Sequence, residues 1–131
     1  MPDLLVDHIG IINKQEEDAM EFYQNLLGLE KIRESFVPPE LSRKLFNLFQ
    51  EIRMLVFVRG NLKIEVFVIP GFTPPSPNIS HFCLQILHFP ELLERLKQAG
   101  AKVITGQHGS KTVYFTEDFS GNRMEIKPLT L

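Results

Sequence analysis

The chain has 131 residues, the usual size of one domain, which excludes two independent globular domains. Its formal net charge of -2 gives no basic field for nucleic acid or an anionic membrane, so neither is an expected partner. The amino terminus lacks the pattern of a secretory signal, and no apolar stretch reaches the roughly 18 residues of a membrane span. We therefore expect a cytoplasmic protein.

The first half of the chain reads as a strand, a helix and three further strands. Apolar residues follow helical spacing up to Leu27, and Gly28 is suited to end that helix. The predicted elements are a strand over residues 4–12, a helix over 14–27, strands over 29–36 and 53–59, and a fourth strand after the turn at Gly60 and Asn61.

The second half repeats this order. From His8 to Gly28 is 20 positions, and from His81 to Gly100 is 19, so the two strand–helix segments have nearly equal lengths. The predicted elements are a strand over residues 79–87, a helix over 89–99, strands over 101–105 and 111–116, and a last strand after Gly121 and Asn122.

One segment accounts for the difference in length between the two halves. His8 and Glu65 are 57 residues apart, whereas His81 and Glu125 are 44 residues apart. The difference of 13 equals the length of Pro38–Gln50, which begins with residues that favour a helix start. We interpret this segment as a short helical insert, either a peg that packs against a sheet or second subunit, or a flap over a pocket.

The repeat predicts an α+β fold of two paired βαβββ units that form one curved mixed sheet, a half-barrel with its helices on the outer face. We expect a single domain over residues 1–131, with unit one at about 1–69 and unit two at about 79–131. The proline-rich residues 70–78 suit neither helix nor sheet and are expected to link the units.

Four polar residues occupy equivalent positions in the two units. Alternate side chains of a strand share a face, so Ile64 and Val66 place Glu65 on the opposite face from the helix. The same alternation directs His8, His81 and Glu125 to the helix-free face, together with Cys83. Cys83 is the single cysteine, which excludes an intrachain disulfide, and we expect it to be buried and apolar.

Two imidazoles and two carboxylates on a concave face form a mixed nitrogen and oxygen ligand set. Such a set suits one divalent ion of Zn, Ni, Co, Fe or Mn and leaves positions open for water or substrate. Single His or Glu residues on a sheet face are mostly structural, and the correlated placement is what favours a metal site here. The alternative is a metal-free relic of such a site.

The sequence resembles the vicinal oxygen chelate superfamily, which includes glyoxalase I, methylmalonyl-CoA epimerase, extradiol dioxygenases, and fosfomycin and bleomycin resistance proteins. The resemblance covers the whole chain and is specific for the superfamily rather than for one activity. It is carried by Asp7-His8-Ile9-Gly10-Ile11, by Phe22-Tyr23 before Leu26-Leu27-Gly28-Leu29, by Ile79-Ser80-His81, and by residues 115–126 around Gly121-Asn122-Arg123-Met124-Glu125.

The resemblance to glyoxalase I implies a metal-dependent lyase or isomerase. The metal ligands of that enzyme match His8, Glu65, His81 and Glu125 position by position. The implied chemistry is proton transfer beside a carbonyl, with Glu125 as the base, or Glu65 at the pseudo-symmetric position. Epimerases usually carry Gln where this chain has Glu65, and the opening around Asp7 looks more like theirs.

Two rival functions stay open. One is a methylmalonyl-CoA epimerase-like enzyme acting on an acyl thioester, and the other is a metal-free small-molecule binding protein of the bleomycin-resistance type. The glyoxalase I-like function and both rivals involve a small-molecule ligand. A half-barrel sheet is commonly closed by a second copy of the chain, so we expect a homodimer. Each of several further positions is a candidate substrate contact or, equally, ordinary surface: the insert, the proline-rich linker, Arg53, Phe57, Arg59, Tyr114 and Arg123.

Overall fold

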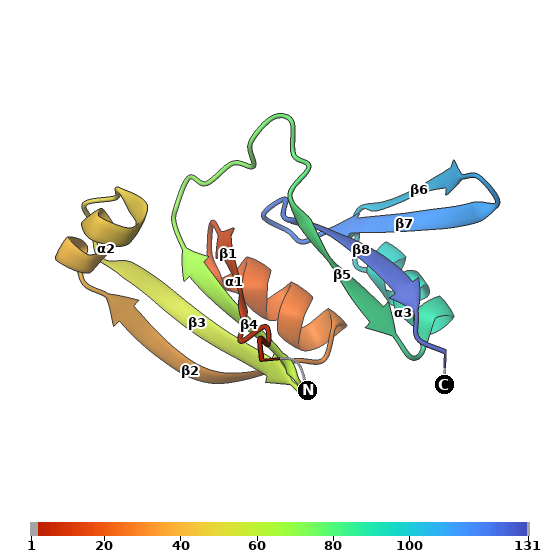
Figure 1. The fold of residues 1–131 in the computed structure, drawn as a ribbon, viewed down its shortest axis with the longest axis horizontal. Coiled ribbons are helices and arrows are strands. Elements are labelled where there is room, and N and C mark those ends of the chain that lie inside the picture. Colours follow the sequence, from red (N-terminus) through yellow and green to blue (C-terminus); the bar gives the residue numbers. More distant parts are fainter. Residues whose placement is uncertain (1–2, 131) are drawn as a thin grey trace. The chain divides into compact units, whose positions relative to one another are not determined.

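Two βαβββ units make up the described part of the chain, residues 3–130, in this computed structural model (Figure 1). The chain divides into Met1–Phe72 and Thr73–Leu131, and each unit contains one four-stranded mixed sheet. The predicted α+β fold with an internal βαβββ repeat is confirmed.

The first unit contains the longer set of elements. Its strands have the order β1-β4-β3-β2, in which β1 pairs parallel with β4 and the other neighbours are antiparallel. The parallel pair is possible because the helical crossover separates β1 from the later strands. The elements are β1 (Ile9–Asn13), α1 (Glu16–Ala19), η1 (Met20–Leu26), β2 (Glu30–Val37), α2 (Pro39–Phe46), β3 (Ile52–Arg59) and β4 (Leu62–Val68).

The crossover helix covers one face of the first sheet. It begins as the α-helix α1 and continues without a break as the π-helix η1, a change of spacing that the apolar periodicity did not predict. Phe22 and Tyr23 are fully buried, and the Tyr23 ring lies 6.1 Å from the ring of Phe57 on β3. Gly28 ends the helix with φ of +79°, as predicted.

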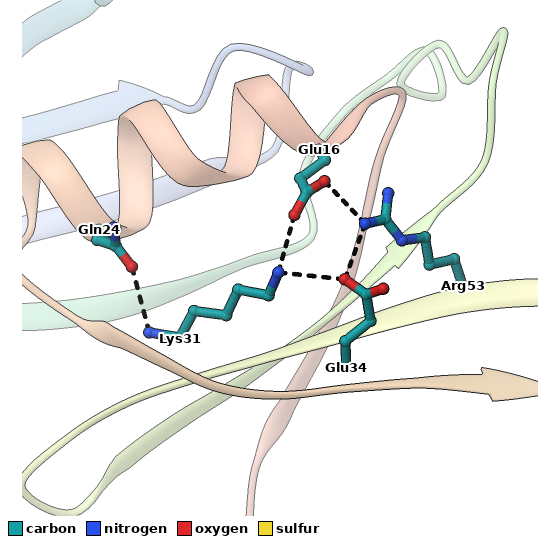
Figure 2. Close-up of polar contacts among 5 residues, drawn as sticks. All are labelled: Glu16, Gln24, Lys31, Glu34 and Arg53. Atoms are coloured by element: carbon teal, nitrogen blue, oxygen red, sulfur yellow. Dashed lines mark hydrogen bonds and ion pairs between the residues drawn. The ribbon is translucent and has the colours of Figure 1, made fainter.

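A cluster of charged side chains joins the start of α1 to β2 and β3 (Figure 2). Lys31 Nζ donates to Glu16 Oε2 at 2.9 Å and to Glu34 Oε1 at 3.1 Å. The Arg53 Nη2 donates to the same two carboxylates, at 2.8 Å to each. These hydrogen bonds hold the pKa of Glu16 and of Glu34 below its ordinary value and raise the pKa of Lys31.

The second unit repeats the arrangement in a shorter form. Its strand order is β5-β8-β7-β6, again with the first and last strands parallel. Leu92 and Leu96 of its helix are buried together with Met124 and Ile126 of its last strand. The elements are β5 (His81–Ile86), α3 (Phe89–Gln98), β6 (Val103–His108), β7 (Lys111–Glu117) and β8 (Arg123–Pro128).

Two details differ from or refine the expected elements. The first strand starts at Ile9 rather than at residue 4, and Leu4, Leu5 and Val6 are at least 80% exposed. The apolar residues 4–6 favoured an earlier strand start, but the pairing between β1 and β4 begins at Ile9. The insert does contain a helix, α2, as predicted. None of the helices within residues 3–130 is long and apolar enough to cross a membrane.

Candidate metal centre

The helix-free face of the first sheet carries one imidazole and one carboxylate. Ile64 and Val66 of β4 are fully buried on the helix side, so Glu65 between them points to the other face. His8 lies directly before β1, whose Gly10 is the Cα partner of Glu65. Strand alternation predicted this placement, and the structure brings the two side chains together.

His8 contacts a carboxylate with each of its ring nitrogens. Its Nδ1 lies 2.8 Å from Asp7 Oδ2, and its Nε2 lies 3.1 Å from Glu65 Oε1. The hydrogen bond with His8, and then the charge of Lys63 with Nζ at 3.7 Å, hold the pKa of Asp7 below its ordinary value. Asp7 is therefore a carboxylate at neutral pH, and its Oδ2 accepts a hydrogen bond from the N–H at His8 Nδ1.

This tautomer leaves a lone pair on His8 Nε2, facing a lone pair on Glu65 Oε1. Two acceptors 3.1 Å apart repel unless a positive centre lies between them. That centre is either a proton on Nε2, which makes a simple ion pair, or a cation bound by both atoms. An imidazole nitrogen and a carboxylate oxygen are both ligand types for divalent ions such as zinc, so these two atoms would be the ones to hold such a cation.

The second unit presents the equivalent pair on β5 and β8. His81 has Arg123 as its Cα partner and Glu125 has Cys83, so His81 and Glu125 lie one alternation step apart on the same face. The His81 Nδ1 donates to the carbonyl oxygen of Ile79 at 2.7 Å, since a carbonyl can only accept. This again leaves Nε2 as the free ligand atom.

In the second pair, neighbouring groups hold His81 more firmly than Glu125. The His81 ring packs edge-to-face on Phe115 of β7, with ring centroids 4.9 Å apart. The Glu125 side chain is 20% exposed, and its Oε2 lies 3.7 Å from Lys127 Nζ, a distance too long for a hydrogen bond. The Glu125 carboxylate is therefore less restrained than that of Glu65.

The described residues supply two His–Glu pairs, one in each unit. No group of three or more His, Cys, Asp or Glu side chains within residues 3–130 has an arrangement that could hold a metal ion. The joining of His8, Glu65, His81 and Glu125 around one ion thus stays a prediction. What supports it is that both histidines have Nδ1 committed to an oxygen, the arrangement typical of metal ligands.

Several other expectations are wrong. Cys83 is exposed rather than buried, because it lies on the helix-free face, beside Glu125. Partial loss of solvent around the sulfur, and then the negative charge of Glu125, raise the pKa of its thiol. Three of the candidate substrate contacts lie on the helix side instead: Arg53 binds Glu16, Phe57 packs on Tyr23, and Tyr114 packs on Phe89 of α3.

Arg59 and Arg123, the other two candidate substrate contacts, form hydrogen bonds within the chain. Arg59 donates to the carbonyl oxygen of Gly28 at 2.9 Å. Arg123 lies on the same face as Glu125, but its guanidinium donates to Glu117 Oε2 at 2.7 Å and to the carbonyl oxygen of Asn78 at 3.2 Å. Both arginines therefore have structural contacts that the sequence did not indicate.

A cavity of about 320 Å³ lies in the first unit, and the sequence analysis did not predict the residues that line it. Phe46 and Leu48, from the insert, form part of its wall, and Phe46 also packs on Phe67 of the sheet, so the contacts agree with both the flap and the peg interpretations. The full lining consists of Gly10, Ile11, Ile12, Phe46, Leu48, Ile52, Phe67 and Ile69.

The sequence and the fold of this chain match a known superfamily. The sequence profile of the Glyoxalase/Bleomycin resistance protein/Dioxygenase superfamily matches residues 7–116. The chain therefore belongs to this superfamily, as its motifs predicted. A comparison with curated proteins finds no significant match.

Solved structures agree with this assignment at the level of the fold. A glyoxalase family protein from Enterococcus faecalis has 22% sequence identity and a TM-score of 0.72, with 93% of this chain and 95% of that chain covered. Glyoxalase I from Leishmania major has 15% identity and a TM-score of 0.72, covering 96% and 87%. A fosfomycin resistance protein from Listeria monocytogenes has 23% identity and a TM-score of 0.69, covering 99% and 94%.

Proposed function

We propose that the chain is a metal-dependent lyase or isomerase of the glyoxalase I type, which moves a proton between the two carbons of a small carbonyl compound. The observation that carries the proposal is the pair of histidines whose Nδ1 atoms are held by Asp7 and by the carbonyl oxygen of Ile79. This hydrogen bond fixes the ring orientation and leaves Nε2 basic, as metal ligands require.

The donor set would hold one divalent ion through His8, Glu65, His81 and Glu125. When bound, such an ion supplies a Lewis acid for the negative charge that develops on a carbonyl oxygen as the neighbouring carbon loses its proton. Among similar solved structures, a mutant of the Listeria fosfomycin resistance protein, 24% identical to this chain, was crystallised with Mn(II). This supports a divalent ion here.

Glu125 is the proposed base. Its contact with Lys127 is long, at 3.7 Å, whereas Glu65 Oε1 lies 3.1 Å from His8 Nε2. A carboxylate that is less restrained can reach a substrate proton, hold it, and return it to the adjacent carbon. Glu65, at the equivalent position of the first unit, is the second choice for this role.

Metal analysis and turnover of a Glu125→Gln variant test the proposal. We expect about one divalent ion per chain by elemental analysis, and turnover of the hemithioacetal of methylglyoxal by the loaded protein. Glu125→Gln is expected to keep its metal and lose roughly 100-fold or more of its turnover, because the amide cannot take a proton. The control is Glu94→Gln, on the exposed side of α3, which should behave as wild type.

Other outcomes would point to the rival functions. Unchanged turnover in Glu125→Gln refutes its role as the base. Turnover of methylmalonyl-CoA in place of the hemithioacetal, in a paired assay, would identify an epimerase. Protein that binds no divalent ion after dialysis against Zn, Ni, Co, Fe and Mn in turn would overturn the metal site and favour a binding protein.

A further inference from the structure

The side chains that line the cavity of the first unit are all apolar. Its eight residues include no charged side chain and no side-chain hydroxyl or amide. Its volume of about 320 Å³ lies at the lower end of small-molecule pockets. At the roughly 30 Å³ that a water molecule occupies in the liquid, this space has the volume of about ten water molecules. The cavity is therefore the size of one ring with a short chain.

This cavity begins next to the His8–Glu65 pair. Gly10 is the Cα partner of Glu65, and Ile12 is the partner of Phe67. Gly10 and Ile12 follow His8 at alternate positions, and Phe67 follows Glu65 in the same way, so all five share one face of the sheet. Two residues along a strand span about 6.6 Å, so the pair and the cavity are direct neighbours.

The insert provides the outer wall of the cavity. The Phe46 ring packs edge-to-face on Phe67, with centroids 5.5 Å apart. Phe46 is still 46% exposed and Leu48 36% exposed, so the wall leaves apolar surface at the mouth that a ligand would cover. In the second unit residues 109 and 110 alone join the corresponding strands, β6 and β7. The wall thus belongs to the first unit's insert.

Gly10 is part of the cavity lining and adds no side chain to it. A Cβ atom built at this position would lie 3.4 Å from Cε2 of Phe67, so the phenylalanine ring already lies over the glycine. Aromatic rings favour offset or edge-to-face contacts with one another. Two phenylalanine rings beside a position without a side chain suit a planar apolar group better than a branched chain.

We propose that the cavity binds an aromatic ring on the substrate, so that the enzyme prefers aryl-substituted to methyl-substituted α-oxo compounds. This inference rests on the proposed function, since it assumes that the reacting oxygens of the same molecule lie at the His8–Glu65 end. The ring then fills the apolar space and the polar end stays on the ligand-bearing strands.

Two hydroxamates that differ in one substituent test the inference. Benzohydroxamate and acetohydroxamate carry the same pair of metal-chelating oxygens, with a phenyl ring or a methyl group attached. Calorimetric titration of the metal-loaded protein should show benzohydroxamate binding at least roughly tenfold more tightly, because the ring buries several more carbons. The same preference should appear in kcat/KM for phenylglyoxal over methylglyoxal hemithioacetals.

Variants locate the preference in this cavity. Phe46→Ala and Leu48→Ala each remove part of the wall, and each should cut the advantage of benzohydroxamate to about threefold or less while acetohydroxamate binding is kept. Phe49→Ala is the matched control, since Phe49 lies in the same insert, is 74% exposed and does not line the cavity. In Phe49→Ala, the ratio of benzohydroxamate to acetohydroxamate affinity should equal that of the wild type.

The possible failures are distinguishable. Equal affinity for the two hydroxamates, or an advantage that survives in both cavity variants, overturns the inference and leaves the metal site intact. Absence of binding by either hydroxamate to protein incubated with divalent ions overturns the proposed function, and this inference with it.

Discussion

Replacement of Asp7 by alanine should weaken metal binding by about tenfold. Asp7 Oδ2 accepts a hydrogen bond from His8 Nδ1 at 2.8 Å and so keeps the proton off Nε2, the proposed ligand atom. Loss of such a partner typically costs 10- to 100-fold in metal affinity. The Asp7 side chain is 75% exposed, so water can take its place in part, which favours the lower end of that range.

The assay is a competition titration of zinc between the protein and a chromophoric chelator. Asp3→Ala, in the same exposed amino-terminal segment, is the control and should leave the affinity unchanged. The second histidine offers an internal comparison, since the carbonyl of Ile79 holds His81 Nδ1 and no side-chain substitution at Ile79 removes that oxygen. An Asp7→Ala affinity equal to wild type would refute the view that this hydrogen bond prepares His8 as a ligand.

Two further predictions concern stability. Phe57→Ala should lower the free energy of unfolding by about 3–5 kcal/mol in urea titrations, because the ring is fully buried, whereas Phe36→Ala, 55% exposed, should change it by less than about 0.5 kcal/mol. The folded-state pKa of Glu16 is below its ordinary value of 4.5, so its stabilisation is complete above about that pH and is lost as the pH falls further. Glu16→Gln should therefore lower the Tm at pH 7 by roughly 2–5 °C and flatten the fall of Tm in acid; an unchanged acid profile would contradict the role of the cluster.

Local sequence rules predicted much of the fold, because the same order of strands and helix occurs in both halves of the sequence. Glycines at equivalent places, Gly28 and Gly100, end the two helices, and both have positive φ angles as such ends require. Strand alternation also predicted that Glu65 faces away from buried Ile64 and Val66. These inferences need only neighbouring residues.

Other features depend on partners that are distant along the chain. Alternation could not show that the β1–β4 ladder begins only at Ile9, since this depends on where β4 pairs. Arg53 was a candidate substrate contact, but its position opposite Val68 near the strand end brings it to Glu16 on the helix side. The π-helical spacing from Met20 onward likewise has no signal in the apolar pattern.

The candidate site likewise has features that the sequence predicts and features that it does not. The identity and the face of the ligand-type residues follow from their strands, whereas the roles of Asp7 and of the Ile79 carbonyl depend on side-chain rotamers that no sequence pattern specifies. The lining of the cavity was not predicted because its wall, Phe46 and Leu48, comes from an insert whose docking position is set by the tertiary packing of Phe46 on Phe67.

The position of the insert has a consequence for how such a protein can diversify. Residues 38–50 connect β2 to β3, whereas His8 and Glu65 belong to the β1 and β4 side of the same sheet. Substitutions, lengthening or grafting in this connection can therefore reshape what the pocket accepts without altering the strands that would carry the reaction. Laboratory libraries aimed at new substrates should randomise this connection first.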